Sequence, residues 1–291
     1  MTYIITFGLI AFLLLGMPVA VSLGLSGLAA FFLEQGARMN VPMVAQRMMY
    51  GINNFLLLAI PLFILAARLM NTSGVTTRLF NFATTLVGFL PGGLGHANCL
   101  ASLIFSGMSG AAVADAAGLG QVELKAMKDA GYDRDFSIAI TAASSTIGPI
   151  FPPSIPMVIF GLVAGVSVGR LFLGGVLPGV VMTIAMMVMV AIYSRRRQYP
   201  RAPVPTAGVV LRATAQAFLP LMTPVILLGG IWTGWFTPTE AAAVAVAYAL
   251  VLGTLVYRDL AWRDLVDAFI GTAKDTAAIG FIVTAASFYG W

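Results

Sequence analysis

Charged side chains are scarce in this sequence of 291 residues. Lys, Arg, Asp and Glu make up only 9% of it, whereas 59% of the residues are hydrophobic. Soluble domains carry roughly 25% charged residues, and a soluble protein of this length still needs a polar surface. The shortage of charge therefore excludes a soluble protein and predicts an integral membrane protein.

Cysteine and histidine are almost absent, with one residue of each, Cys99 and His96. A lone cysteine in an apolar run provides neither a disulfide framework nor a metal site. No Gly-Lys-Ser/Thr loop for a nucleotide is present, so ATP drive would require another chain. The net charge of +5 comes from basic residues at the ends of apolar runs. That is the positive-inside pattern, so we expect membrane lipid around the chain, no nucleic-acid partner and no cofactor apart from a coupling ion.

Long runs without charge dominate the rest of the sequence. Most of them reach the roughly 20 residues that a helix needs to cross the hydrocarbon layer. The two-residue alternation of an outer-membrane barrel is missing, so the predicted class is an all-α membrane protein, a polytopic helical bundle. The runs are 1–33, 48–67, 79–114, 136–169, 171–194, 213–239, 241–257 and 276–291.

The stretch 95–122 is divided by the small residues SGMSG at 106–110. Neither apolar half is long enough for a crossing, so the pattern predicts a re-entrant hairpin that returns to the side it came from. Irregular backbone at membrane depth is tolerated only where protein or water covers it. We expect Ser109 to cap a helix that begins near Gly110, whose free N–H groups suit an anionic group. One continuous helix kinked at glycine is the alternative.

The stretch SSTIGPIFPPSIP at 144–156 places four prolines inside the charge-free run 136–169. Proline removes a backbone donor and clashes with the carbonyl one turn earlier, so no helix continues through this stretch. We expect the first half-helix to end between Thr146 and Gly148, leaving its last carbonyls without helical partners. Ser154 is expected to cap the second half-helix.

Oxygen atoms gather at this break. The hydroxyls of Ser144, Ser145 and Thr146, with unwound carbonyls, provide cation ligands without a buried full charge, as in the sodium sites of discontinuous transporter helices. Asp115 is a further candidate, because a carboxylate at membrane depth is costly and therefore often functional. Its alternative role is that of an acid stabilising the start of its own helix. Asn98 is expected to hydrogen bond between helices rather than to act as a ligand.

The chain carries signs of an internal repeat. With a shift of 220 residues, Pro18 falls on Pro238, and the hydropathy of 19–66 follows that of 239–286. An odd number of predicted crossings separates the two copies, which inverts the second, as in many secondary transporters. We expect the second repeat to be truncated and the chain to be a fragment that lacks the second hairpin and break.

Enzyme activity is the main competing interpretation. GMSG at 107–110 matches the Gly-x-Ser-Gly pattern of rhomboid-like intramembrane serine proteases, with Ser109 and His96 as the candidate pair. In that pattern the histidine lies on a later helix, whereas His96 precedes Ser109. An aspartyl protease would need two intramembrane acids, and only Asp115 is available. We therefore predict that the chain is not an enzyme.

Four stretches together resemble one known family. They are NNFLLLAIPLFILAARLM (53–70), FSGMSGAAVADAAGLG (105–120), TAASSTIGPIFPPSIPMVIFG (141–161) and FTPTEAAAVAVAYAL (236–250). The chain is similar along essentially its whole length to the large membrane (permease) subunit of tripartite ATP-independent periplasmic (TRAP) transporters of the C4-dicarboxylate type. Relative to the family pattern, a second hairpin and break are missing and Ala111 replaces a common serine.

The resemblance implies a function. It implies sodium-coupled, secondary-active uptake (symport) of small organic anions, such as C4-dicarboxylates, sialic acid or related acids, across the bacterial inner membrane. It implies two partners, a small four-helix membrane subunit and a periplasmic substrate-binding protein. It also implies an elevator mechanism, in which a transport domain slides against a scaffold.

The resemblance also implies a division of the chain and a set of site residues. The expected parts are scaffold helices and an arm at 1–91, half of a transport domain at 92–169 (hairpin 95–122 and broken helix 136–168), a closing helix at 170–194 and the start of a second scaffold at 195–291. The residues expected to line sodium and substrate are Ser106, Gly107, Ser109 and Gly110 at the hairpin tip, and Ser144, Ser145, Gly148 and Pro149 at the break.

Two alternatives to this function stay open. One is another sodium-coupled anion transporter with broken helices. The other, from a different class, is a membrane scaffold subunit that does not transport.

Overall fold

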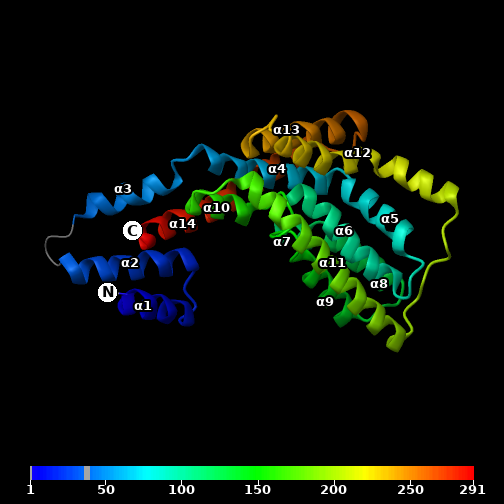
Figure 1. The fold of residues 1–291 in the computed structure, drawn as a ribbon, viewed down its shortest axis with the longest axis horizontal. Helices are drawn as coiled ribbons and strands as arrows, with labels where there is room; N and C mark the ends of the chain where they lie inside the picture. Colours follow the sequence, from blue (N-terminus) through cyan, green and yellow to red (C-terminus); the bar gives the residue numbers. More distant parts are fainter. Residues whose placement is uncertain (1, 36–39) are drawn as a thin grey trace. The chain divides into compact units, whose positions relative to one another are not determined.

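The computed structural model describes residues 2–35 and 40–291, and the regular elements in these residues are helices (Figure 1). The predicted scaffold range 1–91 includes residues 1 and 36–39, which lie outside the described residues. The α-helices are α1 (Thr2–Leu14), α2 (Val19–Gln35), α3 (Val41–Ile52), α4 (Ala59–Thr72), α5 (Val75–Val87), α6 (Gly93–Ser109), α7 (Ala112–Ala117), α8 (Leu119–Asp129), α9 (Arg134–Ser145), α10 (Ile155–Ala164), α11 (Val168–Arg197), α12 (Ala207–Trp232), α13 (Pro238–Val251) and α14 (Trp262–Gly290). A 3₁₀ turn precedes α4 and a π-helical turn extends α13.

Five helical segments of the described chain are long and apolar enough to cross a membrane. The two half-segments of the predicted hairpin and the two of the predicted broken helix are not among them. This pattern confirms the prediction of a helical membrane protein with several crossings. The five segments are Phe55–Thr72, Val168–Arg197, Ala207–Trp232, Pro238–Val256 and Trp262–Gly290.

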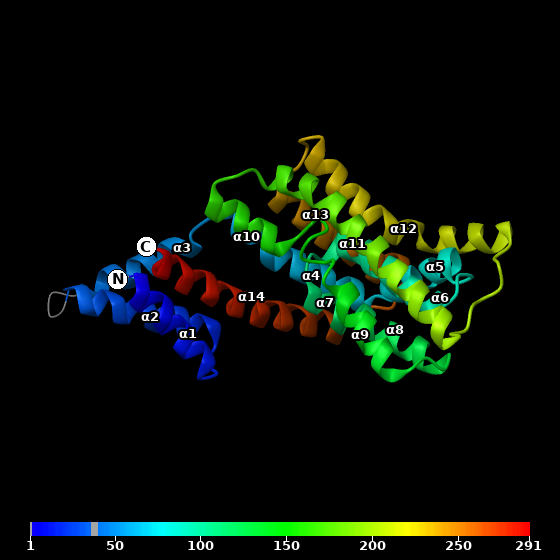
Figure 2. The ribbon, with the colours of Figure 1, turned by 60° about the horizontal axis from the view of Figure 1, so that its bottom comes forward.

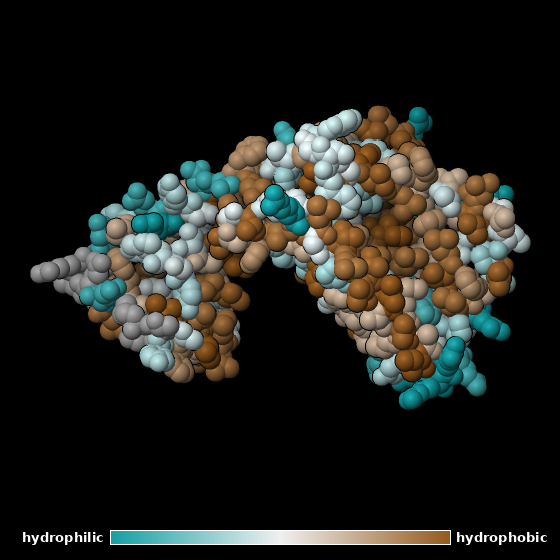
Figure 3. Space-filling model, viewed as in Figure 1, coloured by the Kyte–Doolittle hydropathy of each residue, from teal (hydrophilic) through white to brown (hydrophobic). Residues whose placement is uncertain are grey.

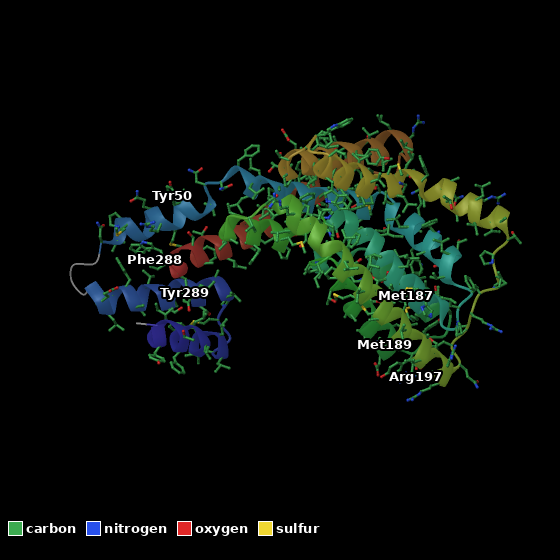
Figure 4. The ribbon with its side chains drawn as sticks, viewed as in Figure 1. Tyr50, Met187, Met189, Arg197, Phe288 and Tyr289 are labelled. Carbon is green, nitrogen blue, oxygen red and sulfur yellow. The ribbon has the colours of Figure 1, made fainter. Side chains whose placement is uncertain are left out.

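The chain packs as two units. The first contains α1, α2, α3 and the part of α14 from residue 273 onward. Its core joins Phe31 of α2, Val44 of α3 and Phe288 of α14, the last of which Figure 4 labels beside Tyr289. Phe31 meets Phe288 edge to face, with ring centroids 6.4 Å apart. This aromatic contact holds the end of α14 against α2 and α3.

The second unit, 58–272, contains the segments that form the candidate site. Helix α6 lies at its centre and packs against α5, α8, α9 and α11, and Figures 1 and 2 both show α9 and α11 close to it. Small residues on α6 allow this close approach. A Cβ added at Gly95, for example, would lie 2.8 Å from Val190 of α11.

Apolar side chains cover much of the visible surface of the second unit, while hydrophilic ones gather at its ends (Figure 3). Along α11, Val181, Ile184, Val188 and Ile192 are exposed. Figure 4 shows Arg197 at the end of the same helix, beyond Met187 and Met189. A long apolar surface that ends in arginines is what a helix in contact with lipid requires.

Side-chain contacts hold the loop between α8 and α9 against the C-terminal end of α11. The Tyr199 hydroxyl donates a hydrogen bond of 2.7 Å to Asp133 Oδ2, and the Arg197 guanidinium forms an ion pair with the same carboxylate. The rings of Tyr132 and Tyr199 stack with centroids 4.5 Å apart. Hydrogen bonds from Tyr199 and Arg197 lower the pKa of Asp133 below its ordinary value.

Candidate functional site

The predicted break in 136–168 is confirmed. Helix α9 ends at Ser145 and α10 begins at Ile155. Between them the backbone makes tight turns, such as the bond of 2.9 Å from Ile150 N to Ile147 O. Ser154 caps α10 as expected: its Oγ accepts from Met157 N at 3.3 Å and donates to Pro149 O at 2.5 Å.

One detail of the prediction for this break is wrong. The carbonyls of Ala143, Ser144 and Ser145 do have partners, because they accept from the N–H groups of the three residues that follow Ser145, at 3.0 to 3.2 Å. The helix tightens into a 3₁₀-like turn at its end, which satisfies these carbonyls within the chain. Each carbonyl oxygen keeps a second lone pair for another donor or an ion.

In the predicted hairpin the helix is interrupted by a turn at 110–111, which we call the reversal. Helix α6 ends at Ser109, Gly110 adopts a left-handed conformation (φ 63°), and α7 begins at Ala112. One continuous kinked helix is therefore excluded. The expectation that Ser109 caps the next helix is wrong, because Ser109 is the last residue of α6 and the N-cap position belongs to Ala111, which has no hydroxyl.

The reversal and the break touch each other. The first N–H of α10, that of Ile155, donates to Gly110 O at 3.2 Å. A Cβ at Gly110 would lie 2.5 Å from Pro153 O, and one at Gly148 would lie 3.2 Å from the backbone of Ala111. Glycine is required here because the two chain segments meet backbone to backbone. We call this contact the junction, comprising residues 109–112 and 146–155.

A buried polar cluster lies between α6 and α9, next to the junction. Asn98 Nδ2 donates to Thr141 Oγ1 at 2.8 Å, and its Oδ1 accepts from Ser144 Oγ at 2.7 Å. Ser102 Oγ donates to Ser144 Oγ at 3.1 Å, and Ser145 Oγ donates to Thr141 O at 2.8 Å. None of the five side chains is more than 4% exposed. The prediction that Asn98 bonds between helices is thus confirmed.

Asp115, on α7, faces this cluster and is 1% exposed. Its carboxylate lies beside the side chains of Ser102 and Ser145 but makes no hydrogen bond of good geometry in the described structure. Asp115 lies in the first turn of α7, as its alternative role as a helix-stabilising acid requires, but it accepts no hydrogen bond from a backbone N–H of that helix. The arrangement is a buried negative charge next to hydroxyl oxygens, which suits a small cation.

The other predicted site residues are placed differently. Ser106 is buried and donates to Ser102 O at 2.6 Å, whereas the buried Ser109 hydroxyl makes no hydrogen bond in the described structure. Gly107 faces α12 instead, where a Cβ would lie 2.8 Å from Pro224. Thr146 is exposed and donates to Ala143 O at 2.6 Å. Gly148 and Pro149 lie in the junction.

Ser102, Thr141 and Glu123 were missed by the sequence argument. Asn98, Ser102 and Ser106 recur every four residues, and this helical spacing could have indicated one polar face on α6. Glu123 was not considered as a site residue, although it is 1% exposed.

The serine-protease alternative fails on geometry. His96 and Ser109 lie on the same helix, α6. Thirteen residues at 1.5 Å each separate them by about 20 Å, far beyond hydrogen-bond reach. Neither the His96 ring nitrogens nor Ser109 Oγ has a hydrogen-bond partner in the described residues.

A hollow of about 510 Å³ lies between α6 and α12, and one residue of the junction borders it. Leu103, Ile104, Phe151, Leu221 and Leu228 are among its lining residues, and the lining is apolar. An anion needs donors or positive charge, so we place the candidate site at the junction and the polar cluster instead.

The fold and the site are typical of a multi-pass membrane protein of the transporter class. The features that indicate this class are several apolar spans, two interrupted segments in contact, and buried oxygens beside them. Residues 6–291 match the family described as "Tripartite ATP-independent periplasmic transporter, DctM component", and the chain belongs to this family. The prediction from the four sequence stretches is confirmed.

Relatives in this family are named as transporter permease proteins. The chain is 48% identical over 285 residues to the sialic acid TRAP transporter large permease protein SiaM of Vibrio cholerae, covering 98% of this chain and 66% of that protein. It is 44% identical to the sialic acid TRAP transporter permease protein SiaT of Haemophilus influenzae, covering 95% of this chain and 44% of that protein. Identity to the C4-dicarboxylate TRAP transporter large permease protein DctM of Vibrio cholerae is 38%, covering 86% of this chain and 55% of that protein.

The chain thus spans less than two thirds of the length of each of these relatives. Membership of a transporter family agrees with the prediction that the chain is a large permease subunit and not an enzyme.

Proposed function

We propose that the chain takes part in sodium-coupled uptake of a small organic anion, as the large permease subunit of a TRAP transporter. The observation that carries the proposal is the junction, where the reversal at Gly110 meets the break before Ile155 beside buried hydroxyls. Two interrupted segments in contact provide backbone and hydroxyl groups at membrane depth, which is how secondary transporters bind ions and substrates.

Sodium is the proposed coupling ion because of the donor set. Ser144, Ser145 and Ser102 each use the hydroxyl hydrogen as a donor, which leaves oxygen lone pairs for a cation. Asp115 supplies a negative charge next to them. In the described residues no three His, Cys, Asp or Glu side chains come together. The hydroxyl and carboxylate oxygens of the proposed site suit Na⁺ better than a transition metal. Thr146 and Gly148 are further proposed sodium ligands at the break. Pro149 beside them, with Ser106, Gly107, Ser109 and Gly110 at the hairpin tip, is proposed to line the ion and substrate site.

Sialic acid is the first substrate to test. The two relatives named as sialic acid transporters are 48% and 44% identical, against 38% for the relative named as a C4-dicarboxylate transporter. The full set of candidates is C4-dicarboxylates, sialic acid and related acids.

The architecture is proposed to be an elevator built from inverted repeats, in the bacterial inner membrane. Pro18 directly precedes α2 and Pro238 is the first residue of α13, which supports the repeat. On this proposal the hairpin 95–122 is re-entrant, and 92–169 moves against scaffold parts at 1–91 and 195–291. The partners are a small four-helix membrane subunit and a periplasmic substrate-binding protein.

The test is uptake by the full-length subunit with both partners in liposomes. We expect a sodium gradient to drive accumulation of labelled sialic acid, and Ser145→Ala to weaken the dependence on sodium by about tenfold or more, because one cation ligand is lost. Thr254→Ala, at an exposed hydroxyl that donates to Leu250 O and has no place in the proposed site, is the comparison for side effects of substitution. An uptake rate that changes neither with sodium nor with Ser145→Ala would contradict the proposal and favour a scaffold subunit.

A further inference from the structure

Glu123 is a buried acid that the proposed sodium site does not use. It lies on α8 and is 1% exposed, and neither carboxylate oxygen makes a hydrogen bond in the described structure. Leu119 and Met127, one turn before and one turn after it, are fully buried. The carboxyl group therefore lies on the face of α8 that packs into the protein.

The surroundings of Glu123 are apolar on most sides. Met127 belongs to a cluster with Cys99 of α6 and Ile140 of α9, while Leu119 belongs to the core formed by α4, α5 and α6. A carboxylate in such surroundings, without donors or a cation, is strongly destabilised relative to the neutral acid.

Charged and titratable groups near Glu123 do not relieve this penalty. Asp115 is a second buried acid, on the helix α7 that packs against α8, and Cys99 of α6 belongs to the same cluster as Met127. His96 is the other titratable side chain buried on α6, and its ring nitrogens have no hydrogen-bond partner among the described residues.

The remaining helices that contact α8 supply no counter-charge. Helix α9 has no titratable side chain from Phe136 to Ser145. The titratable side chain of α5, Arg78, pairs with Asp259 at 3.6 Å. Lys125 and Lys128 of α8 itself are exposed on its other face.

We propose that Glu123 is a proton-binding site that opposes cation binding at Asp115. This inference rests on the proposed sodium site. A proton bonded to one oxygen of Glu123 makes the side chain neutral, and it comes from and returns to bulk water. When the proton leaves, a second negative charge is present on α8, which packs against the helix of Asp115, and it attracts the cation more strongly. By linkage, bound sodium also promotes loss of the proton.

The proton is tested directly by infrared spectroscopy of the full-length protein. We expect a carbonyl stretch of a protonated carboxyl group at neutral pH, shifted when glutamate is labelled with ¹³C at its carboxyl carbon. Glu123→Gln should remove this band and Asp115→Asn should retain it. A spectrum in which no labelled band is present, or in which the band survives Glu123→Gln, overturns the inference.

The linkage is tested by the sodium concentration that gives half-maximal uptake in the reconstituted complex, measured across a pH series. In the unaltered protein this concentration should fall as pH rises, by up to about tenfold per pH unit, the limit when one proton leaves for each sodium bound. Glu123→Gln should make this profile shallower, and any slope that remains comes from the proton that sodium displaces at Asp115 itself. Asp129→Asn, at an exposed acid of the same helix, should keep the pH dependence.

The two experiments separate the inference from the proposed function. A pH dependence that Glu123→Gln leaves unchanged overturns the linkage while leaving sodium coupling intact. Uptake by the unaltered protein without any sodium dependence overturns the proposed coupling and the linkage, and the infrared band still decides whether Glu123 holds a proton.

Discussion

The two interruptions of the second unit are built from different chemistry. The reversal at 110–111 uses one left-handed glycine and no proline, and the helix that follows has no side-chain cap. The break at 146–154 uses a run of prolines and 3₁₀-like turns, and Ser154 caps the helix that follows. The first interruption therefore depends on the absence of a side chain, and the second on side chains that are present.

This difference has a consequence for the junction. A proline-rich segment holds its own shape, because each ring fixes one backbone angle. A single glycine does not, so the reversal at Gly110 depends on its contact with Pro153 and Ile155. The broken segment therefore keeps its conformation by itself, whereas the conformation of the hairpin tip depends on contact with the broken segment.

Gly110→Ala should have the largest effect on stability. It adds a Cβ to a left-handed residue at 2.5 Å from Pro153 O, so strain and overlap combine. We expect a loss of about 3 kcal/mol in the free energy of unfolding. Gly131→Ala is the matched control, because Gly131 is also left-handed (φ 79°) but faces open space, and it should cost about 1 kcal/mol. Equal losses in thermal or denaturant unfolding would show that the contact with Pro153 contributes nothing.

Asn98→Ala should have the next largest effect, because the polar cluster joins the helices that precede the two interruptions. The change leaves the buried hydroxyls of Thr141 and Ser144 without their amide partner. We expect a loss of about 2 kcal/mol, measured by the same unfolding experiment. Asn81→Ala, at an exposed asparagine of α5, should change stability by less than about 0.5 kcal/mol. Similar losses for both asparagines would show that the polar cluster does not stabilise the fold.

Removing the side-chain cap of α10 and adding one to α7 tests how much a cap contributes at each interruption. Ser154→Ala removes the acceptor for Met157 N and should cost about 1 kcal/mol. Ala111→Ser places a hydroxyl at an N-cap with suitable extended backbone (φ −140°, ψ 124°) and should gain about 0.5 kcal/mol. Hydrogen exchange in the first turn of each helix provides the measurement. Faster exchange in α7 after Ala111→Ser would contradict the capping argument.

Asp133 lies in the loop that connects the two interrupted segments, and Asp133→Asn should have the smallest effect on the free energy of unfolding. Because Tyr199 and Arg197 lower the pKa of Asp133, its ionised form stabilises the fold above the ordinary value of 3.8. That contribution is lost as pH falls through the lowered folded-state pKa. The difference in stability between the two proteins should therefore shrink in acid. A difference for Asp133→Asn that stays constant in acid would contradict the assignment.

The break was predictable in more detail than the reversal, for a physical reason. Prolines forbid a helix whatever surrounds them, so the end of α9 and the cap at Ser154 followed from local chemistry. The turn at Gly110 depends on a segment more than forty residues away, and the sequence alone wrongly assigned Ser109 as a cap. Thr141 and Glu123 were missed because their importance comes from the helices that bury them. The last carbonyls of α9 were expected to be free because 3₁₀ tightening is not visible in a sequence pattern.

Phe151, in the middle of the break, lies against glycines of two neighbouring helices. A Cβ at Gly179 of α11 would lie 2.8 Å from its ring, and one at Gly107 of α6 would lie 3.7 Å from it. A ring seated between two helices in this way resists sliding of either helix past it. On the proposed elevator mechanism, displacement of the broken segment would therefore move α11 with it, and the moving body would include one helix beyond the division 92–169.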